Sequence, residues 1–182
     1  MKVAVAFDHR GVHLREAVLE VLGGHEVIDL GTDTDAVRID YPDKAREVGE
    51  AIQRGEAARG VLVCGSGVGA SVAACKMTGI RAAICHDIYS AHQGVEHDDM
   101  NVLCLGSEVV GPSLARELVV AFLNAQFDGG QRYVERLLKV AAMETFMKVG
   151  DAASVSLRGE AGLAPAKAPE RVLGATNKTE KE

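Results

Sequence analysis

The fold is decided by the stretch Val61-Leu62-Val63-Cys64-Gly65-Ser66-Gly67-Val68-Gly69, where a run of apolar residues leads directly into alternating glycines. The apolar run is typical of a buried β-strand, and the pattern after the glycines is helical over residues 69–76. A strand joined to a helix by a glycine-rich turn is a unit of α/β proteins. The backbone N–H groups of such a turn and the positive end of the next helix attract an anion. The sequence therefore predicts an α/β protein with an anion-binding turn at residues 64–69.

Similar apolar runs and helical patterns alternate along the rest of the chain. Runs rich in Val, Ile and Leu occupy residues 3–7, 26–30, 61–64, 82–85 and 102–105. Helical patterns lie between and after them at residues 12–22, 43–54, 69–76, 88–96 and 112–124. This alternation predicts βαβ units and a Rossmann-like three-layer sandwich, with a five-stranded parallel sheet and helices on both faces. Of the two common doubly wound strand orders, the five-stranded one fits the number of elements better than the six-stranded dinucleotide-binding one.

The domain organisation follows from length and composition. A chain of 182 residues is long enough for one core and short for two, so residues 1–149 are predicted to form one domain. An amphipathic helix is expected over residues 131–147, and because no strand follows it, this helix either caps its own domain or contacts a second subunit. Residues 150–182 contain no aromatic residue and are rich in Ala, Gly, Pro, Lys and Glu, which predicts a disordered tail.

The composition also argues against several classes of partner. The net charge is −6 and there is no basic stripe, so neither a nucleic acid nor an acidic membrane surface is expected as a partner. No run approaches the roughly 20 apolar residues of a membrane helix, and the first apolar run ends at Asp8, too early for a secretory signal. Four cysteines without C-x-x-C spacing indicate reduced, mostly buried thiols. We therefore expect a soluble cytoplasmic protein.

The anion-binding turn has more than one interpretation. Its field would favour the thiolate of Cys64, although a cysteine in such a place, taken alone, is more often a core residue. Gly65–Ala70 also fits the loose G-x-G-x-x-G/A pattern of dinucleotide sites, with Asp87 at the spacing of a ribose ligand. That pattern belongs after the first strand of such folds, so here it is weak support for a dinucleotide.

Polar residues also lie at other predicted strand ends. Asp8 and His9 follow the first strand and bring a carboxylate and an imidazole to the edge where ligands bind in open α/β sheets. Asp8 is equally suited to cap the first helix. The segment 96–99, Glu-His-Asp-Asp, suggests either a metal cluster or a solvated loop. Consecutive ligands are poor metal-site spacing, so no metal is predicted.

Read together, these segments resemble one family: type B ribose-5-phosphate isomerase, with the related galactose-6-phosphate and allose-6-phosphate isomerases. The resemblance covers residues 1–142. It rests on Asp8-His9-x-Gly11, Asp40-Tyr41-Pro42, Cys64-Gly65-Ser66-Gly67-Val68-Gly69, Tyr89-Ser90-Ala91, His97-x-Asp99-x-Asn101-Val102-Leu103, and Gly129-Gly130 followed by Arg132 and Arg136. It implies an aldose–ketose isomerase that acts on a phosphorylated aldose without metal or cofactor. It also implies a homodimer or dimer of dimers with active sites shared between subunits.

The resemblance implies a role for each matching residue. Isomerisation through an enediolate needs a base at carbon, a site for the oxyanion and an acid–base group at the two oxygens. By resemblance, Cys64 is the carbon base, and Ser66 assists ring opening or binds the substrate. Asp8 is implied to move the proton between O1 and O2, and His97 to open the furanose ring. Substrate binding is implied for His9, Tyr41, Gly65, Gly67, Val68, Gly69, Asp98, Arg132 and Arg136. Within that set, the imidazole and the two guanidinium groups would hold the phosphate.

Three positions depart from the family pattern. Asp98 stands where an Asn commonly follows the ring-opening His, Glu108 where an Arg is often found, and Tyr133 where a His is often found. The first two add negative charge near an expected phosphate, which is unfavourable. The departures bear on the identity of the sugar phosphate more than on the reaction.

Three functions are therefore carried forward. The first is reversible isomerisation of ribose 5-phosphate to ribulose 5-phosphate, with another phosphorylated aldose as substrate (allose 6-phosphate, galactose 6-phosphate or a tetrose phosphate) as the runner-up. The second is an NAD-dependent oxidoreductase built on the glycine turn. The third is a non-catalytic module that binds a phosphorylated ligand.

Overall fold

The computed structural model describes residues 1–149, and the predicted tail at 150–182 lies outside the described residues. The strands are β1 (Lys2–Phe7), β2 (Glu26–Asp29), β3 (Arg59–Cys64), β4 (Ala82–Ile84) and β5 (Val102–Gly106). The helical segments are the 3₁₀ turn η1 (Gly11–Leu14) and the helices α1 (Arg15–Leu22), α2 (Tyr41–Gln53), α3 (Val68–Ala74), α4 (Ile88–Asp98), α5 (Pro112–Asn124) and α6 (Gln131–Val149). None of the described helices is long and apolar enough to cross a membrane.

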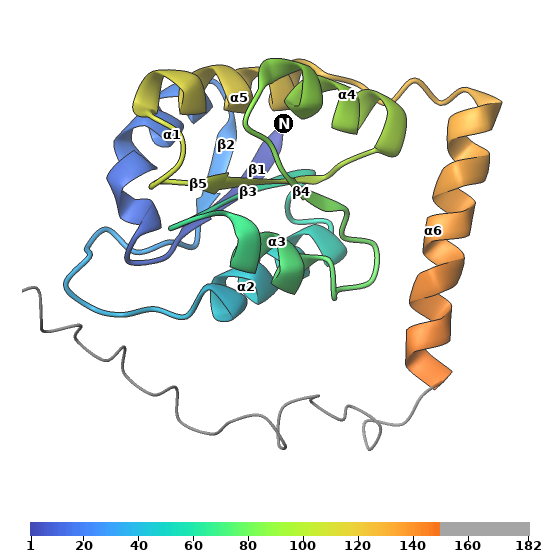
Figure 1. Ribbon diagram of the computed structural model, residues 1–182, viewed down its shortest axis with the longest axis horizontal. Helices are drawn as coiled ribbons and strands as arrows, with labels where there is room; N and C mark the ends of the chain where they lie inside the picture. The colour runs from blue at the N-terminus through green and yellow to red at the C-terminus, as the bar shows by residue number, and fades with distance from the viewer. Residues whose placement is uncertain (150–182) are drawn as a thin grey trace, which may run out of the picture. The chain divides into compact units, whose positions relative to one another are not determined.

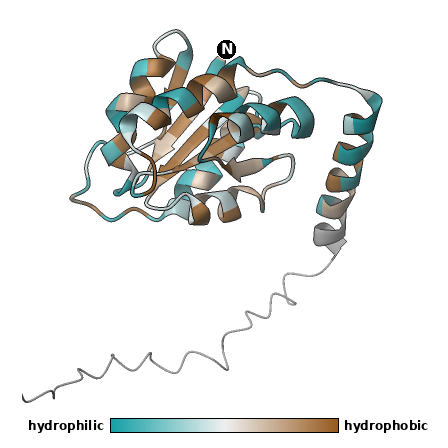
Figure 2. Ribbon diagram, turned by 45° about the horizontal axis from the view of Figure 1, so that its top comes forward, coloured by the Kyte–Doolittle hydropathy of each residue, from teal (hydrophilic) through white to brown (hydrophobic). Residues whose placement is uncertain are grey.

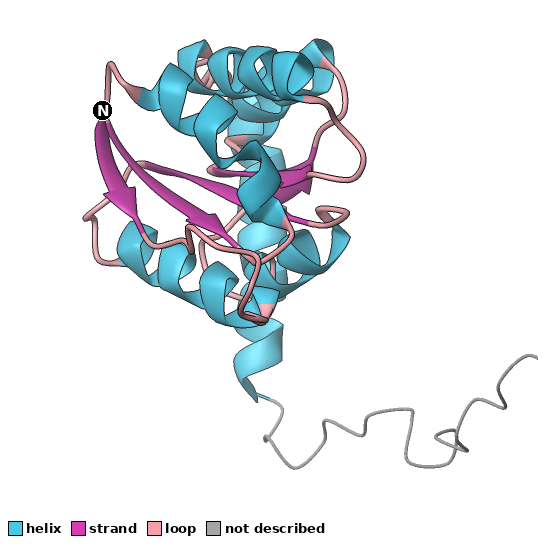
Figure 3. Ribbon diagram, turned by 90° about the vertical axis from the view of Figure 1, so that its left-hand side faces the viewer, coloured by secondary structure: helices cyan, strands magenta, loops and turns pink. Residues whose placement is uncertain are grey.

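The strands form a parallel sheet between two layers of helices, as Figures 1 and 3 show. On one face α5 packs against both α1 and α4, and on the other face α2 and α3 pack together. The predicted five-stranded parallel sheet with helices on both faces is thereby confirmed. All strands point the same way, so their carboxyl ends meet at one edge of the sheet.

The strand order is β2-β1-β3-β5-β4. The common five-stranded order, which the sequence favoured, places β4 beside β3. That part of the prediction is wrong, because β4 and β5 have exchanged places. β5 lies beside β3, with Cys64 opposite Gly106, and β4 forms the edge. The physical reason is burial: β5 is buried along all of its five residues, whereas β4 has three partly buried residues. A short strand is better suited to an edge with one unpaired side.

The alternation of side chains along β1 separates two apolar cores. Val3, Val5 and Phe7 point to the face covered by α1, α4 and α5, whereas Ala4 and Ala6 point to the face covered by α2 and α3. Figure 2 shows the apolar strands enclosed by helices whose outer surfaces are hydrophilic. The first core contains buried phenylalanines, Phe7 and Phe122, whereas the second contains several alanines, among them Ala45, Ala70 and Ala74.

Most element boundaries match the sequence prediction to within a few residues. The clearest difference is the first helix, expected over residues 12–22, which is divided into η1 and α1. The carboxylate of Asp8 lies at its start, where Oδ1 accepts hydrogen bonds from the N–H groups of Arg10 and Gly11. A side chain that bonds to the next backbone groups competes with regular helix geometry, which accounts for the tighter first turn.

Candidate active site

The glycine turn brings a thiol and backbone N–H groups together at the end of β3. Gly67 has φ of 81°, a left-handed conformation that glycine adopts without strain, and it directs its N–H back toward the strand end. This N–H donates to Sγ of Cys64 at 3.1 Å, and the Cys64 residue is only 5% exposed. Ser66 Oγ accepts from the N–H of Val68 at 3.3 Å. Donors aimed at sulfur stabilise a thiolate, so the turn can support a nucleophile or base.

Asp8 lies on the neighbouring strand end, next to Cys64. The parallel register pairs Phe7 with Val63. Asp8 directly follows Phe7, and Cys64 directly follows Val63. The carboxylate is 5% exposed, and its Oδ1 accepts from the N–H groups of Arg10 at 2.9 Å and Gly11 at 2.7 Å. The alternative that Asp8 caps the first helix is wrong, because Arg10 is the N-cap residue of η1 and Leu14 that of α1, and neither cap has a side-chain hydrogen bond. The hydrogen bonds from Arg10 and Gly11 engage Oδ1 alone, which leaves Oδ2 as the oxygen that can exchange a proton.

Two more predicted substrate-binding residues lie beside the same turn. The ring of Tyr41 packs against Gly69, where a Cβ would be only 2.7 Å from Cζ of the phenol. His9 places Nδ1 3.2 Å from the backbone oxygen of Ile39, so the loop before α2 is connected to the end of β1. A tyrosine and an imidazole therefore flank the turn and Asp8.

The end of β5 completes this edge. The N–H of Ser107 donates to the oxygen of Cys64 at 2.9 Å, and the N–H of Glu108 donates to the oxygen of Gly65 at 3.0 Å. Ser107 Oγ donates to the oxygen of Arg10 at 2.8 Å. The loops after β1, β3 and β5 are thus connected by hydrogen bonds into one rigid rim around the thiol.

His97 and the residues predicted beside it form a second group. The imidazole of His97 stacks on the ring of Tyr133, with the ring centroids 4.4 Å apart. The guanidinium of Arg132 also lies over the Tyr133 ring, 4.8 Å from its centroid. Nδ1 of His97 is 2.7 Å from Nε2 of Gln93. Asp98 and Arg136 are exposed.

This second group lies at the opposite edge of the sheet from Cys64. The last turn of α4 contacts the segments that precede β4 and β5, since Arg81 Nε donates to the oxygen of Asp99 at 2.6 Å and the N–H of Asn101 donates to the oxygen of Arg81 at 3.1 Å. A strand rises about 3.3 Å per residue, so the length of β5 separates the two edges by roughly 15 Å. One chain therefore brings Asp8, His9, Tyr41, Ser66 and the turn together, but not His97, Asp98, Arg132 or Arg136.

The other cysteines differ from Cys64. Cys85 and Cys104 are buried, and burial raises the pKa of Cys85 to about 11 and that of Cys104 well above its ordinary value. Both are inert thiols at neutral pH. Cys75 is exposed, unlike the mostly buried thiols expected, and its Sγ donates to the backbone oxygen of Ala82 at 3.1 Å.

The dinucleotide alternative loses one of its supports in the structure. Asp87, the proposed ribose ligand, instead caps α4 by accepting from the N–H of Ser90 at 2.7 Å and from its hydroxyl at 2.8 Å. It also follows β4, which β5 separates from β3. Within residues 1–149, no three His, Cys, Asp or Glu side chains converge in a way that would hold a metal ion.

Two residues of interest were not assigned a role from the sequence. Arg10 forms an ion pair with Glu108 beside the turn, with Nε 3.3 Å from Oε1. Tyr133 contacts both the imidazole of His97 and the guanidinium of Arg132. The position of Arg10, two residues after Asp8, was a signal in the sequence that it lies near the site. Its contact with Glu108 depends on the fold.

Comparison with known proteins identifies the family. The family model described as Ribose/Galactose Isomerase matches residues 3–140. The chain belongs to the ribose/galactose isomerase family. Ribose-5-phosphate isomerase B of Escherichia coli is 45% identical over 145 residues, which are 79% of this chain and 96% of the relative. D-erythrulose-4-phosphate isomerase of Pectobacterium atrosepticum is 38% identical over 132 residues, 71% of this chain and 87% of the relative.

A solved structure gives the same result. Ribose-5-phosphate isomerase B of Clostridium thermocellum is 42% identical and superimposes with a TM-score of 0.77, covering 81% of this chain and 99% of that chain. Membership of the ribose/galactose isomerase family makes the protein an aldose–ketose isomerase that acts on a phosphorylated sugar. The resemblance stated from the sequence is thereby confirmed at the level of the family and the reaction class.

Proposed function

We propose that the protein interconverts ribose 5-phosphate and ribulose 5-phosphate, with Cys64 as the base that moves the proton between C1 and C2. The observation that carries this proposal is the Gly67 N–H that donates to Sγ of Cys64 at 3.1 Å, at the mouth of a turn with further backbone donors. Family membership supports the reaction class, and the 45% identity to the ribose-5-phosphate isomerase B of E. coli supports the choice of sugar.

The proposed reaction begins with the open-chain aldose. The Cys64 thiolate removes the proton from C2, the C–H electrons form a C1=C2 double bond, and the carbonyl electrons move to O1. The backbone N–H groups of residues 65–69 stabilise the resulting oxyanion. Asp8 accepts the proton of the O2 hydroxyl and delivers it to O1. The Cys64 thiol then returns its proton to C1, which yields the ketose and restores the thiolate.

We propose that a second copy of the chain completes the site. His97, which opens the furanose ring in this scheme, and the arginines Arg132 and Arg136, which hold the phosphate with His9, lie at the opposite edge from Cys64. Supporting this, α6 exposes apolar side chains that favour burial against another surface: Val134, Leu138, Val140 and Met143. Residues 1–149 would then be the isomerase domain of a homodimer or dimer of dimers with shared sites.

The runner-up is isomerisation of another phosphorylated aldose by the same mechanism. Its support is the 38% identity to the D-erythrulose-4-phosphate isomerase of P. atrosepticum, together with the carboxylates of Asp98 and Glu108 at positions where the family pattern differs. The two proposals differ in the sugar, not in the chemistry.

An isomerase assay with a panel of phosphorylated aldoses tests the proposal. The panel comprises ribose 5-phosphate, allose 6-phosphate, galactose 6-phosphate and a tetrose phosphate. Turnover should be fastest with ribose 5-phosphate, and Cys64→Ala should lower kcat by about a thousandfold or more. The matched control is Cys75→Ala, since that thiol lies outside the turn. Clear turnover of another aldose with none of ribose 5-phosphate would select the runner-up. Full activity of Cys64→Ala would reject the assigned base.

Complementation tests the shared site. Co-expression of Cys64→Ala with His97→Ala should restore activity, because a mixed dimer has one site that takes Cys64 from one chain and His97 from the other. Random pairing should restore about one quarter of wild-type activity. If both residues acted within one chain, every site would lack one of them and no activity would return.

A further inference from the structure

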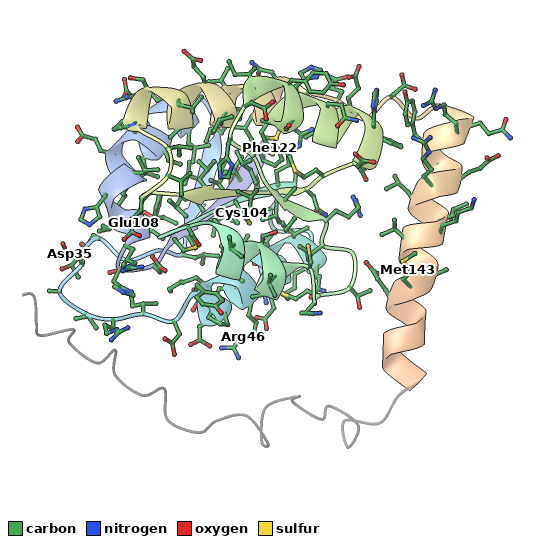
Figure 4. The ribbon with its side chains drawn as sticks, viewed as in Figure 1. Asp35, Arg46, Cys104, Glu108, Phe122 and Met143 are labelled. Carbon is green, nitrogen blue, oxygen red and sulfur yellow. The ribbon has the colours of Figure 1, made fainter. Side chains whose placement is uncertain are left out.

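An ion pair crosses the rim of the glycine turn, and neither partner has a role in the scheme above. Nε of Arg10 lies 3.3 Å from Oε1 of Glu108, and the side chains are 58% and 55% exposed. Glu108 is one of the carboxylates whose charge conflicts with an anionic substrate. In Figure 4, Glu108 lies at the periphery of the domain, whereas Cys104 and Phe122 lie in its interior.

The backbone of Arg10 is held firmly on this rim. Its N–H donates to Oδ1 of Asp8 at 2.9 Å, and its oxygen accepts from the hydroxyl of Ser107 at 2.8 Å. Its side chain lies directly against the first glycine of the turn, because a Cβ on Gly65 would be 2.9 Å from Cδ and 3.1 Å from Nη1 of the arginine. The backbone of Arg10 is therefore fixed beside the turn, whereas its guanidinium is exposed and paired with Glu108.

The strength of the pair decides what the guanidinium can do. An exposed ion pair contributes little to stability, about 0–1 kcal/mol, because water screens both charges. A phosphate dianion offers arginine two parallel, charge-assisted hydrogen bonds, which are stronger than one exposed contact to a carboxylate. A phosphorylated ligand at the rim can therefore take the guanidinium of Arg10 from Glu108.

We propose that Arg10 is a specificity-determining residue that binds the phosphate group of the substrate, and that Glu108 is the residue that positions its guanidinium over Gly65 in the unliganded site. The proposal rests on the proposed function for its choice of a sugar phosphate as ligand. The positive charge of Arg10 also offsets the negative charge of Glu108 beside an anionic substrate.

The first test is Arg10→Leu in the full-length chain, assayed with ribose 5-phosphate. We expect KM to rise about tenfold or more with kcat little changed, and inhibition by inorganic phosphate to weaken by a similar factor. Arg10→Lys, which keeps the charge but loses the planar fork, should lie between wild type and Arg10→Leu. The matched control is Arg54→Leu, since Arg54 is 54% exposed and also paired with carboxylates, those of Glu50 and Glu56, but follows the far end of α2. The control should leave KM unchanged.

The second test uses Glu108 to separate binding from structure. Without Arg10, Glu108 is an unpaired carboxylate that repels the phosphate. Adding Glu108→Gln to Arg10→Leu should therefore lower KM again, by about threefold or more. A purely structural role of Arg10 would not be rescued by the removal of a negative charge.

Three results would overturn the proposal: an unchanged KM and phosphate inhibition in Arg10→Leu, a fall in kcat at constant KM, or no rescue by Glu108→Gln. Calorimetric binding of ribose 5-phosphate distinguishes this failure from failure of the proposed function. A wild-type protein that binds ribose 5-phosphate through Arg10 but isomerises no sugar phosphate would reject the function and retain the Arg10 assignment. Isomerase activity that is unchanged by substitution of Arg10 would retain the proposed function and reject the Arg10 assignment.

Discussion

The two edges of the sheet differ in how completely they are built. At the carboxyl edge, Asp8 and Cys64 are buried, and hydrogen bonds connect the loops after β1, β3 and β5. At the amino edge, His97 is partly exposed, and Arg132 and Arg136 lie exposed on α6. The first region is organised by its own chain, which suits the proton transfer that we propose for it. The second carries the residues that we propose for ring opening and phosphate binding, and these make few contacts of their own, which suits a site shared with another subunit.

The largest effect is expected from Asp8→Asn, which separates chemistry from structure at the carboxyl edge. Asparagine keeps an oxygen that can accept from the N–H groups of Arg10 and Gly11, so the melting temperature should change little. It cannot accept and return a proton, so kcat should fall by about 10²–10⁴-fold. Steady-state kinetics and thermal unfolding measure the two effects. A variant with full kcat would reduce Asp8 to a loop cap.

The second effect concerns the buried thiols of Cys85 and Cys104. The folded pKa of Cys85 is raised to about 11 by burial, so its stabilisation is complete below the unfolded value near 9 and is lost as the pH rises toward 11. At about 1.4 kcal/mol per pKa unit, the free energy of unfolding should fall by about 2 kcal/mol over that range. Cys104 adds a loss of the same sign. Denaturant unfolding at several pH values should show a weaker alkaline loss in Cys85→Ala. An identical slope in the variant would contradict the assignment.

The third effect tests the exposed region. Arg136→Leu should raise KM for the sugar phosphate about tenfold to a hundredfold, because a charge-assisted contact to phosphate is lost. The melting temperature should stay constant, since Arg136 is exposed. Lys139→Leu is the matched control, as it removes another exposed cation of α6. Equal changes of KM in both variants would indicate a general effect of charge, not a specific phosphate contact.

The smallest effect is expected at Tyr133, which contacts both His97 and Arg132. Tyr133→Leu removes the stacked ring, and an aromatic contact of this kind contributes about 0.5–1.5 kcal/mol. We expect kcat/KM to fall about twofold to tenfold, with Tyr133→Phe close to wild type because the ring remains. A loss in Tyr133→Phe equal to that in Tyr133→Leu would assign the effect to the hydroxyl instead.

Local patterns in the sequence were sufficient to predict the elements and to place Cys64, Asp8 and the glycine turn at one edge of the sheet. Cys64, Asp8 and the glycine turn follow strands that are legible as apolar runs, and the ends of parallel strands must meet at one edge. The sequence pattern did not predict the order of β4 and β5. That order depends on which strand is better buried beside β3, a non-local property of the packed sheet.

The sequence by itself determined the α/β class, the glycine turn after β3 and, through the ordered motifs, the family. These depend on hydrophobic periodicity and on glycine, which act over a few residues. Only the tertiary structure decided that His97 lies across the sheet from Cys64 and that Arg10 meets Glu108. Both depend on where the ends of helices and strands lie in three dimensions: α4 runs back against the strands and carries His97 to the amino edge, whereas the loops after β1 and β5 converge over Gly65.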